Sequence, residues 1–275
     1  MKRFTVKELA SAGLIASLYT VLSLAFMPIS FGVYQIRVAE ALTVLPFLTR
    51  AAVPGLYIGC LLANIIGGMG WLDIVFGPLI TLAAALITRG LYHLSRRPVT
   101  LLPAVVPVVL MWGGSIYLLN GGAVTINTVS GVGLSLLSLV LILFTEKKRA
   151  AGAATELVDW LLRALSMALA LVAVFLLRQT DDTFVFLCGA ITWLATPVVT
   201  ALLARLWFSG DNPNLLIAPL PPVLLNAFGV SAYLAPLIGV SYWFSVQMVG
   251  VGQLIACYLI GLPILILLQR RKSVF

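Results

Sequence analysis

Residues 31–47 read Phe31-Gly32-Val33-Tyr34-Gln35-Ile36-Arg37-Val38-Ala39-Glu40-Ala41-Leu42-Thr43-Val44-Leu45-Pro46-Phe47. This stretch places an arginine and a glutamate three residues apart, beside a glutamine and aromatic residues, at the edge of a very apolar segment. Ionisable groups near the interior of a bilayer are costly, so each one needs a physical reason. Recognition of a small polar molecule is the sharpest reason that this stretch offers.

The composition excludes an ordinary soluble domain. The chain has 275 residues, of which 61% are hydrophobic and only 9% are charged, whereas soluble domains carry about 25% charged residues. We therefore expect an all-α integral membrane protein. The formal net charge of +8 is spread over short clusters between apolar runs. It forms no basic face with interleaved aromatic residues, so no nucleic acid partner is expected.

Ten apolar segments recur along the chain, each long enough to span or nearly span a bilayer. They lie near residues 9–27, 38–49, 53–68, 72–95, 101–119, 126–145, 157–177, 183–208, 215–236 and 243–269. The second is short and carries Arg37 and Glu40, so we interpret it as a helix that lines a cavity, not as a span that faces lipid.

The basic residues predict the orientation. If the N-terminus is cytoplasmic and loops alternate, nearly every Lys and Arg falls on the cytoplasmic side, as the positive-inside rule requires. The inside set is Lys2, Arg3, Lys7, Arg50, Arg96, Arg97, Lys147, Lys148, Arg149, Arg205, Arg270, Arg271 and Lys272, and the outside set is Arg37 and Arg178. We expect a multi-pass protein of the cell membrane with both termini in the cytoplasm.

Other sequence signals predict no processing or metal chemistry. The first apolar run is long for a signal peptide and lacks a clear small-x-small cleavage site, so we interpret it as a retained helix. The three cysteines, Cys60, Cys188 and Cys257, lie inside apolar runs, and their spacing fits no metal motif. His93 stands beside Arg96 and Arg97 near a helix end. No metal or cofactor is expected.

In this topology, the polar side chains of the first four and last two segments gather in the outer half of the membrane. Those near the outer surface are Gln35, Arg37, Glu40, Trp71, Asp73, Tyr242, Trp243 and Gln247, and those between there and the midplane are Asn64, Asn226 and Gln253. The inner halves are almost purely aliphatic. This asymmetry predicts a pocket that opens outward above a dry floor, because a channel needs polar groups along its whole length.

Each of these residues also has a structural interpretation. Arg37 and Glu40 could simply pair on one helix face, and Asp73 could only cap the next helix. The aromatic residues could form an interfacial belt, and the amides could hold helices together. Their common depth favours a binding role. Carboxylates accept paired N–H groups, amides read ring heteroatoms, and aromatic rings stack, so the expected ligand is a small planar heterocycle.

Five stretches resemble the QueT family of substrate-binding S components of energy-coupling factor (ECF) transporters. They are Ser30–Phe47, Pro54–Asn64, Gly70–Gly77, Pro219–Asn226 and Gly252–Pro263. The resemblance implies a six-helix core that captures queuosine precursors, which are deazaguanine bases. It also implies a partner module of one membrane coupling protein and two ATPases.

The resemblance further implies a docking role for the first helix. In such systems an Ala-rich first helix docks on the coupling protein, and Ala12 and Ala16 occupy the matching positions, in a small-xxx-small pattern that permits close helix approach. One departure concerns Gln253, where we expect glutamate in the family, so the exact base stays open.

The second departure is an insertion. Residues 98–212 have no counterpart in a minimal S component and add about four spans, whereas residues 1–97 and 213–275 supply the first four and last two helices of the core. The insert echoes the core in places, for example Ile191-Thr192 beside Ile80-Thr81, so a decayed internal duplication is one hypothesis. It lacks the polar outer set, and we expect that it does not line the pocket.

We therefore predict a substrate-capture subunit of an ATP-driven importer, not an enzyme. Because the chain has no Gly-x-x-x-x-Gly-Lys-[Ser/Thr] loop, ATP hydrolysis would fall to its partners. Glu40 and Asp73 are expected to grip a guanine-like edge, and Arg37 to fix Glu40 or the connecting loop. Directional hydrogen bonds would come from Gln35, Asn64, Asn226, Gln247 and Gln253, and stacking from Tyr34, Trp71 and Trp243.

Three alternatives stay open. An ion-coupled secondary transporter would show inverted repeats and broken helices near the midplane. An intramembrane enzyme would need a nucleophile with its base, or metal ligands, inside the spans. An S component for a different vitamin would change the ligand but not the mechanism.

Overall fold

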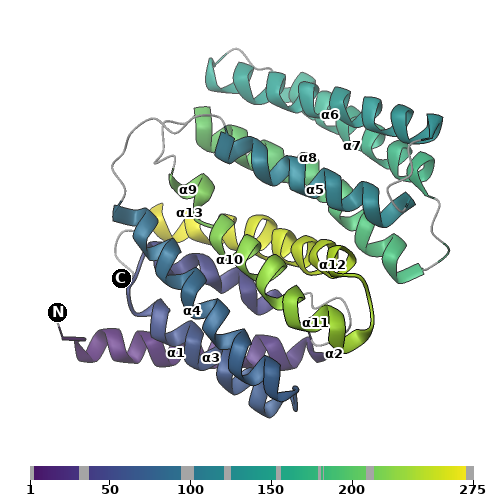
Figure 1. Cartoon of the computed structure of the whole chain (residues 1–275). Helices are drawn as coiled ribbons and strands as arrows, with labels where there is room; N and C mark the ends of the chain where they lie inside the picture. Colours follow the sequence, from purple (N-terminus) through teal and green to yellow (C-terminus); the bar gives the residue numbers. More distant parts are fainter. Residues whose placement is uncertain are drawn as a thin grey trace. The chain divides into compact units, whose positions relative to one another are not determined.

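The computed structural model describes residues 3–30, 37–93, 102–120, 125–152, 156–178, 181, 183–208 and 214–270. Within these residues the regular structure is entirely helical (Figure 1). The chain divides into two compact units. The first unit comprises residues 1–97 and 214–275, and the second comprises residues 98–213.

The first unit contains six apolar segments built from straight and irregular helices. Before the second unit come α1 (Val6–Ala25), α2 (Met27–Ser30), η1 (Val38–Phe47), α3 (Ala52–Ile66) and α4 (Trp71–His93). After it come α9 (Asn214–Ile217), α10 (Leu220–Leu225), η2 (Asn226–Val230), α11 (Ser231–Ile238), α12 (Tyr242–Leu254), η3 (Ile255–Gly261) and α13 (Leu262–Arg270). The second unit holds four helices, α5 (Leu102–Asn120), α6 (Ile126–Ala150), α7 (Glu156–Leu177) and α8 (Thr183–Phe208).

Among the described residues, seven helical segments are long and apolar enough to cross a membrane. Three shorter apolar stretches, at Val38–Phe47, at Ala52–Ile66 and at Val106–Leu119 within α5, occupy the remaining predicted positions. The ten apolar segments are thus where the sequence predicts them, and seven of them qualify as full spans within the part of the chain that the structure describes. The ten residues of η1 form a 3₁₀ helix and extend about 20 Å, which is short of the roughly 30 Å hydrocarbon core. The chain is an all-α integral membrane protein.

Helix η1 lies inside the first unit, and every residue from Ala39 to Phe47 is buried. It packs against α1, α3, α4 and η3. A glycine makes one of these contacts possible, because a Cβ atom on Gly261 would lie 2.7 Å from the carbonyl oxygen of Ala41. The backbone of η3 therefore touches η1 directly. Neighbouring protein, instead of lipid, surrounds this short helix, which is how an irregular segment is tolerated at membrane depth.

Helices α1 and α3 pack backbone to backbone. Cβ atoms on Gly55 and Gly59 would lie 2.7 Å from the Ala12 carbonyl oxygen and 2.9 Å from the Ala16 carbonyl oxygen. The Thr20 hydroxyl reinforces the contact by donating to the Gly59 carbonyl at 3.2 Å. Small residues on both helices let them approach closely where lipid offers no hydrophobic drive for association.

Two later segments contain π-helical turns, η2 at Asn226–Val230 and η3 at Ile255–Gly261. Each interrupts a longer helix, since η2 joins α10 to α11 and η3 joins α12 to α13. Such π-turns are rare and occur frequently at functional sites. Both lie in the unit that holds the buried acids described below.

The second unit is held by helix pairs, α6 with α7 and α5 with α8. The rings of Trp112 and Trp193 stack with centroids 6.0 Å apart, and the hydroxyls of Ser138 and Ser166 lie 2.7 Å apart. Glu146 is only 2% exposed. Its carboxylate accepts from Arg163 at 2.5 Å and from Arg205 at 3.0 Å.

Glu146→Gln is expected to lower the stability of the chain by about 2 kcal/mol, because hydrogen bonds to charged groups contribute roughly 1.5–3 kcal/mol. The variant leaves two guanidinium groups around a neutral side chain. Thermal unfolding in detergent measures the effect. Arg205→Gln should lower the stability less, since the Arg205 side chain is 45% exposed and Arg163 still donates to Glu146. Equal melting temperatures for Glu146→Gln and the unmodified chain would contradict this account of the unit.

Candidate substrate site

Glu40 is a buried acid held by neutral donors from two other helices. It lies in the first turn of η1 and is 2% exposed. The Tyr19 hydroxyl of α1 donates to Oε1 at 2.5 Å, and the Asn226 amide of η2 donates to Oε2 at 3.2 Å. An amide and a phenol thus satisfy both carboxylate oxygens, which a buried charged group requires.

The backbone at Glu40 is fixed as well. Its carbonyl oxygen accepts from the Thr43 hydroxyl at 2.6 Å and lies 3.5 Å from the Cys257 sulfur of η3. Cys257 also lies 3.7 Å from Oε1 of Gln253. These contacts connect the start of η1 to the C-terminal helix. Cys257 and Cys60 are buried free thiols, and the described residues hold no group of His, Cys, Asp or Glu suited to a metal ion.

Asp73 is the second buried acid, 4% exposed in the first turn of α4. Its Oδ1 atom lies 3.6 Å from a guanidinium nitrogen of Arg37 and accepts from the Tyr233 hydroxyl of α11 at 2.9 Å. The Asn64 amide of α3 donates to the Asp73 backbone carbonyl at 2.7 Å. The acid therefore does more than cap its own helix, because it links four segments of the unit.

Asn64 fits under α4 because Gly77 has no side chain. A Cβ atom on Gly77 would lie 2.8 Å from Nδ2 of Asn64, too close for an unstrained contact. Asn64 is fully buried, and its Oδ1 atom has no hydrogen-bond partner in the structure. A buried acceptor of this kind needs a physical reason, and an acceptor that reads an N–H group of a ligand supplies one.

The structure brings six of the predicted residues into buried positions of the first unit. They are Arg37, Glu40, Asn64, Asp73, Asn226 and Gln253, each 6% exposed or less. Tyr34 and Gln35 lie outside the described residues. We name the two acids with Arg37, Tyr19, Asn226 and Tyr233 the acid cluster, and treat Asn64 and Gln253 as its neighbours.

Two predicted contacts, Trp71 and Trp243, are largely exposed in the structure, and a third, Gln247, is half-buried. Trp71 is 70% exposed and Trp243 is 63% exposed, so their rings point away from the interior of the unit, where the acid cluster is buried. Trp243 instead contacts Tyr242 edge to face, as residues of an interfacial belt would. Gln247 is half-buried on α12. In this conformation the stacking role expected of the two tryptophans has no geometric support.

Ala12 and Ala16 also face inward. They are 7% and 5% exposed and pack on Gly55 and Gly59 of α3. The exposed face of α1 presents Leu9, Leu14, Leu18 and Val21 instead. The small-xxx-small pattern serves contact within the chain here, and direct docking through these alanines would require α1 to leave α3.

Sequence reasoning missed two hydroxyl donors, Tyr19 and Tyr233. Both are tyrosines inside apolar segments, and a buried tyrosine usually finds a hydrogen-bond partner for its hydroxyl. Tyr19 follows Ala12 and Ala16 on the same face of a helix, with spacings of four and three residues. That face is the one that packs inward.

Tyr233→Phe is expected to lower stability by about 1–2 kcal/mol, because it leaves Oδ1 of Asp73 with one donor fewer in a buried place. Tyr242→Phe is the matched control, since its hydroxyl donates to the Phe228 carbonyl at an exposed position. Thermal unfolding in detergent compares the two. A larger loss for the control than for Tyr233→Phe would contradict the assignment of Tyr233 to the acid cluster.

The fold and the buried polar groups define a multi-pass membrane protein with a polar site enclosed by helices. The family model described as QueT transporter matches residues 9–117 and 180–270. The chain belongs to this transporter family. The interval between the matched ranges contains α6 and α7.

One curated relative is similar over a shorter stretch. The chain is 30% identical over 84 residues to a protein named Queuosine precursor transporter QueT from Lactococcus lactis subsp. cremoris (strain MG1363). The aligned segment covers 30% of this chain and 49% of the relative, so it spans about half of the relative's length. No solved structure matches the chain.

Proposed function

We propose that this chain is the substrate-binding membrane subunit of an ATP-driven importer of the energy-coupling factor type, with queuosine precursors as its ligands. The observation that carries the proposal is the pair of buried acids, Glu40 and Asp73, held in one unit by an arginine, two tyrosines and an amide. The family of transporters and the name of the relative support it.

The acid cluster has the chemistry to read a guanine-like base. Such a base carries adjacent N–H groups on one edge, and a carboxylate accepts such paired donors with two parallel hydrogen bonds. In this conformation Arg37 presents its guanidinium to Asp73, and a guanidinium has the same N–C–N pattern of donors. We infer that the base takes the position of this guanidinium and that Asp73 and Glu40 together grip its N–H edge, while Asn64 and Asn226 supply further directional contacts.

The conformation described is a closed one. Glu40 and Asp73 are 2% and 4% exposed, so a ligand reaches them only after nearby segments move. In the proposed mechanism, ligand binding from outside precedes docking on the coupling protein, reorientation of the subunit and release inside.

The partner module is part of the proposal. A membrane coupling protein and two ATPases would supply the energy, and both termini would face the cytoplasm of a cell whose plasma membrane holds the complex. The role of Ala12 and Ala16 in docking is retained in an indirect form. By holding α1 against α3, they fix which face of α1 a partner meets. The chain itself is proposed to have no enzymatic activity.

Mass spectrometry of small molecules that co-purify with the detergent-solubilised chain tests the ligand. The expected result is a deazaguanine released from the unmodified chain and absent from Glu40→Gln. Glu146→Gln is the matched control, because that acid is equally buried, at 2% exposed, but lies in the second unit. A different vitamin in the unmodified chain, or a deazaguanine retained by Glu40→Gln, would contradict the proposal.

A secondary transporter driven by ions is the second candidate. The π-turns that interrupt two helices, η2 and η3, favour it, because such transporters build their sites on discontinuous helices. Uptake in reconstituted vesicles decides between the two. Accumulation that requires the coupling protein and ATP supports the first proposal, and accumulation by this chain alone under an ion gradient supports the second.

A further inference from the structure

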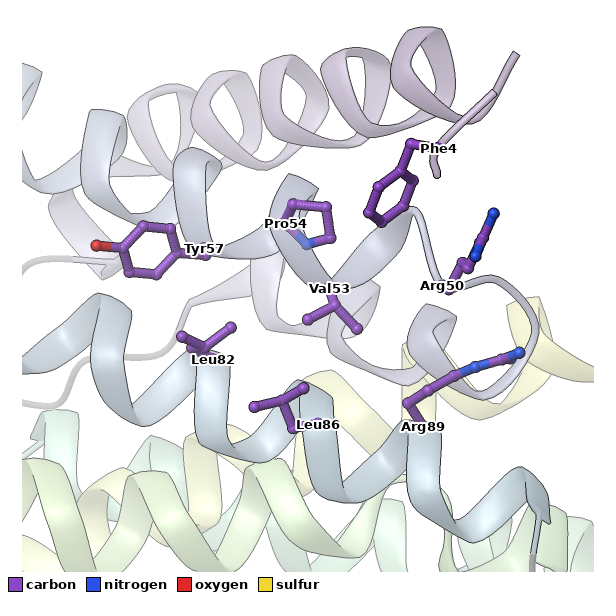
Figure 2. Close-up of a pocket in the computed structure, with 8 residues that line it drawn as sticks. All are labelled: Phe4, Arg50, Val53, Pro54, Tyr57, Leu82, Leu86 and Arg89. Carbon is purple, nitrogen blue, oxygen red and sulfur yellow. The ribbon is translucent and has the colours of Figure 1, made fainter. Parts of the chain in front are cut away.

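A groove separate from the acid cluster opens between α3, α4 and the segment that precedes α1. Its volume is about 410 Å³. Figure 2 shows its lining, with Arg50 and Arg89 at one end, Tyr57 towards the other and aliphatic side chains between them. The lining residues are Phe4, Arg50, Val53, Pro54, Tyr57, Leu82, Leu86 and Arg89.

The cationic end of the groove lies at the ends of three membrane helices. Helix α1 begins at Val6 and α3 begins at Ala52, while α4 ends at His93. Arg89 therefore stands one turn from the end of α4, where a bilayer meets water. From Arg89 to Leu82 the groove follows two turns of α4, about 10 Å, towards the interior of the membrane. Its floor is apolar along this length.

A second cavity of about 290 Å³ adjoins this end and shares Arg50 and Arg89. Its lining adds Lys7 and Glu8. The mouth thus carries three cationic side chains and one acidic side chain, a surplus of two positive charges. Arg50 donates to the Glu8 carboxylate at 2.6 and 2.8 Å, and these hydrogen bonds raise the pKa of the Arg50 guanidinium and keep it charged.

We propose that this groove binds one anionic phospholipid, with an acyl chain along Val53, Leu82 and Leu86 and its phosphate at Lys7, Arg50 and Arg89. The charge surplus at the mouth selects an anionic headgroup, and basic pockets between membrane helices on the cytoplasmic side are known to hold such headgroups. The apolar floor behind that mouth accommodates a chain, which a free phosphate does not have.

The lipid would also act on the unit that carries the acid cluster. Arg89 donates to the Pro46 and Phe47 carbonyls, both at 3.3 Å, so it contacts the C-terminal end of η1. A phosphate bound by Lys7 of α1 and Arg89 of α4 would therefore connect these two helices to η1, on which Glu40 lies. This inference does not depend on the identity of the transported substrate.

Native mass spectrometry of the full chain in detergent tests the proposal with phosphatidylglycerol and phosphatidylcholine of identical acyl chains. One bound phosphatidylglycerol is expected, preferred by at least about tenfold, since each cation near a headgroup contributes roughly fivefold. Lys7→Gln should reduce this preference about fivefold. Leu86→Trp, at a 56% exposed position, should fill the groove and weaken binding of both lipids.

Two controls accompany this test. The first detects a general effect of charge, and the second detects binding of a headgroup without acyl chains. Arg149→Gln removes an exposed cation from α6 in the second unit and should leave the preference unchanged. Glycerol 3-phosphate, which has the headgroup charge without acyl chains, should not compete. Equal binding of the two lipids would overturn the proposal, and a protein partner would then be the expected occupant of the groove. Unchanged binding in both Lys7→Gln and Leu86→Trp, or competition by glycerol 3-phosphate, would overturn it as well.

Discussion

Glu40→Gln is expected to weaken binding of a deazaguanine by about 100-fold or more. The substitution keeps the size of the side chain but removes the charge that would accept paired N–H groups. Hydrogen bonds to charged groups contribute roughly 1.5–3 kcal/mol each, so the loss of two such bonds corresponds to at least two orders of magnitude in affinity. Titration followed by intrinsic tryptophan fluorescence measures the change.

The control for this prediction is Glu146→Gln. Both acids are 2% exposed and both accept two hydrogen bonds, so each replacement removes a buried carboxylate that has two donors. Only Glu40 belongs to the acid cluster. We expect the Glu146 variant to lose stability but to keep its affinity for the base. Affinity that falls equally in the two variants would show that the effect of Glu40→Gln arises from general destabilisation.

Gly59→Ala is expected to lower stability by about 2 kcal/mol, in the range observed for overpacked interiors. The new methyl group would lie 2.8 Å from Cβ of Tyr19 and 2.9 Å from the Ala16 carbonyl oxygen. Neither neighbour is the free end of a flexible side chain, so α1 must move away from α3. Because Tyr19 donates to Glu40, the shift should also weaken ligand binding.

Gly13→Ala is the matched control, since it lies on α1 and a Cβ atom there meets nothing within 4 Å. Alanine is the better helix former by about 1 kcal/mol, so this variant should be as stable as the unmodified chain or more stable. Thermal unfolding and ligand titration on the same samples compare both variants. A Gly59→Ala chain that melts and binds like the control would contradict the close packing of α1 on α3.

The sequence predicts where the apolar segments lie along the chain better than it predicts which face of each helix points inward. Hydropathy locates these segments, and charged residues mark their ends, so the expected depth of Glu40, Asp73 and Asn226 comes from counting along each helix. Which face points inward does not follow, because lipid tails are as apolar as aliphatic side chains. For this reason the sequence predicts Trp71 and Trp243 in the pocket, although both are largely exposed in the structure.

Partners are similarly hard to infer from one sequence. The small residues at Ala12 and Ala16 indicate that a helix approaches closely, but they do not say whether that helix belongs to the same chain. The structure supplies Gly55 and Gly59 of α3. Likewise, Arg37 and Glu40 stand three residues apart, yet the ion pair found in the structure joins Arg37 to Asp73, a contact that depends on tertiary packing.

We propose that the acid cluster holds a planar base in the position now occupied by the Arg37 guanidinium. An experimental structure of the full chain with a deazaguanine bound tests it most directly. We expect ring N–H groups to lie about 3 Å from carboxylate oxygens of Asp73 or Glu40, with Arg37 displaced from Asp73. A base bound elsewhere, with the Arg37–Asp73 pair intact, would contradict it.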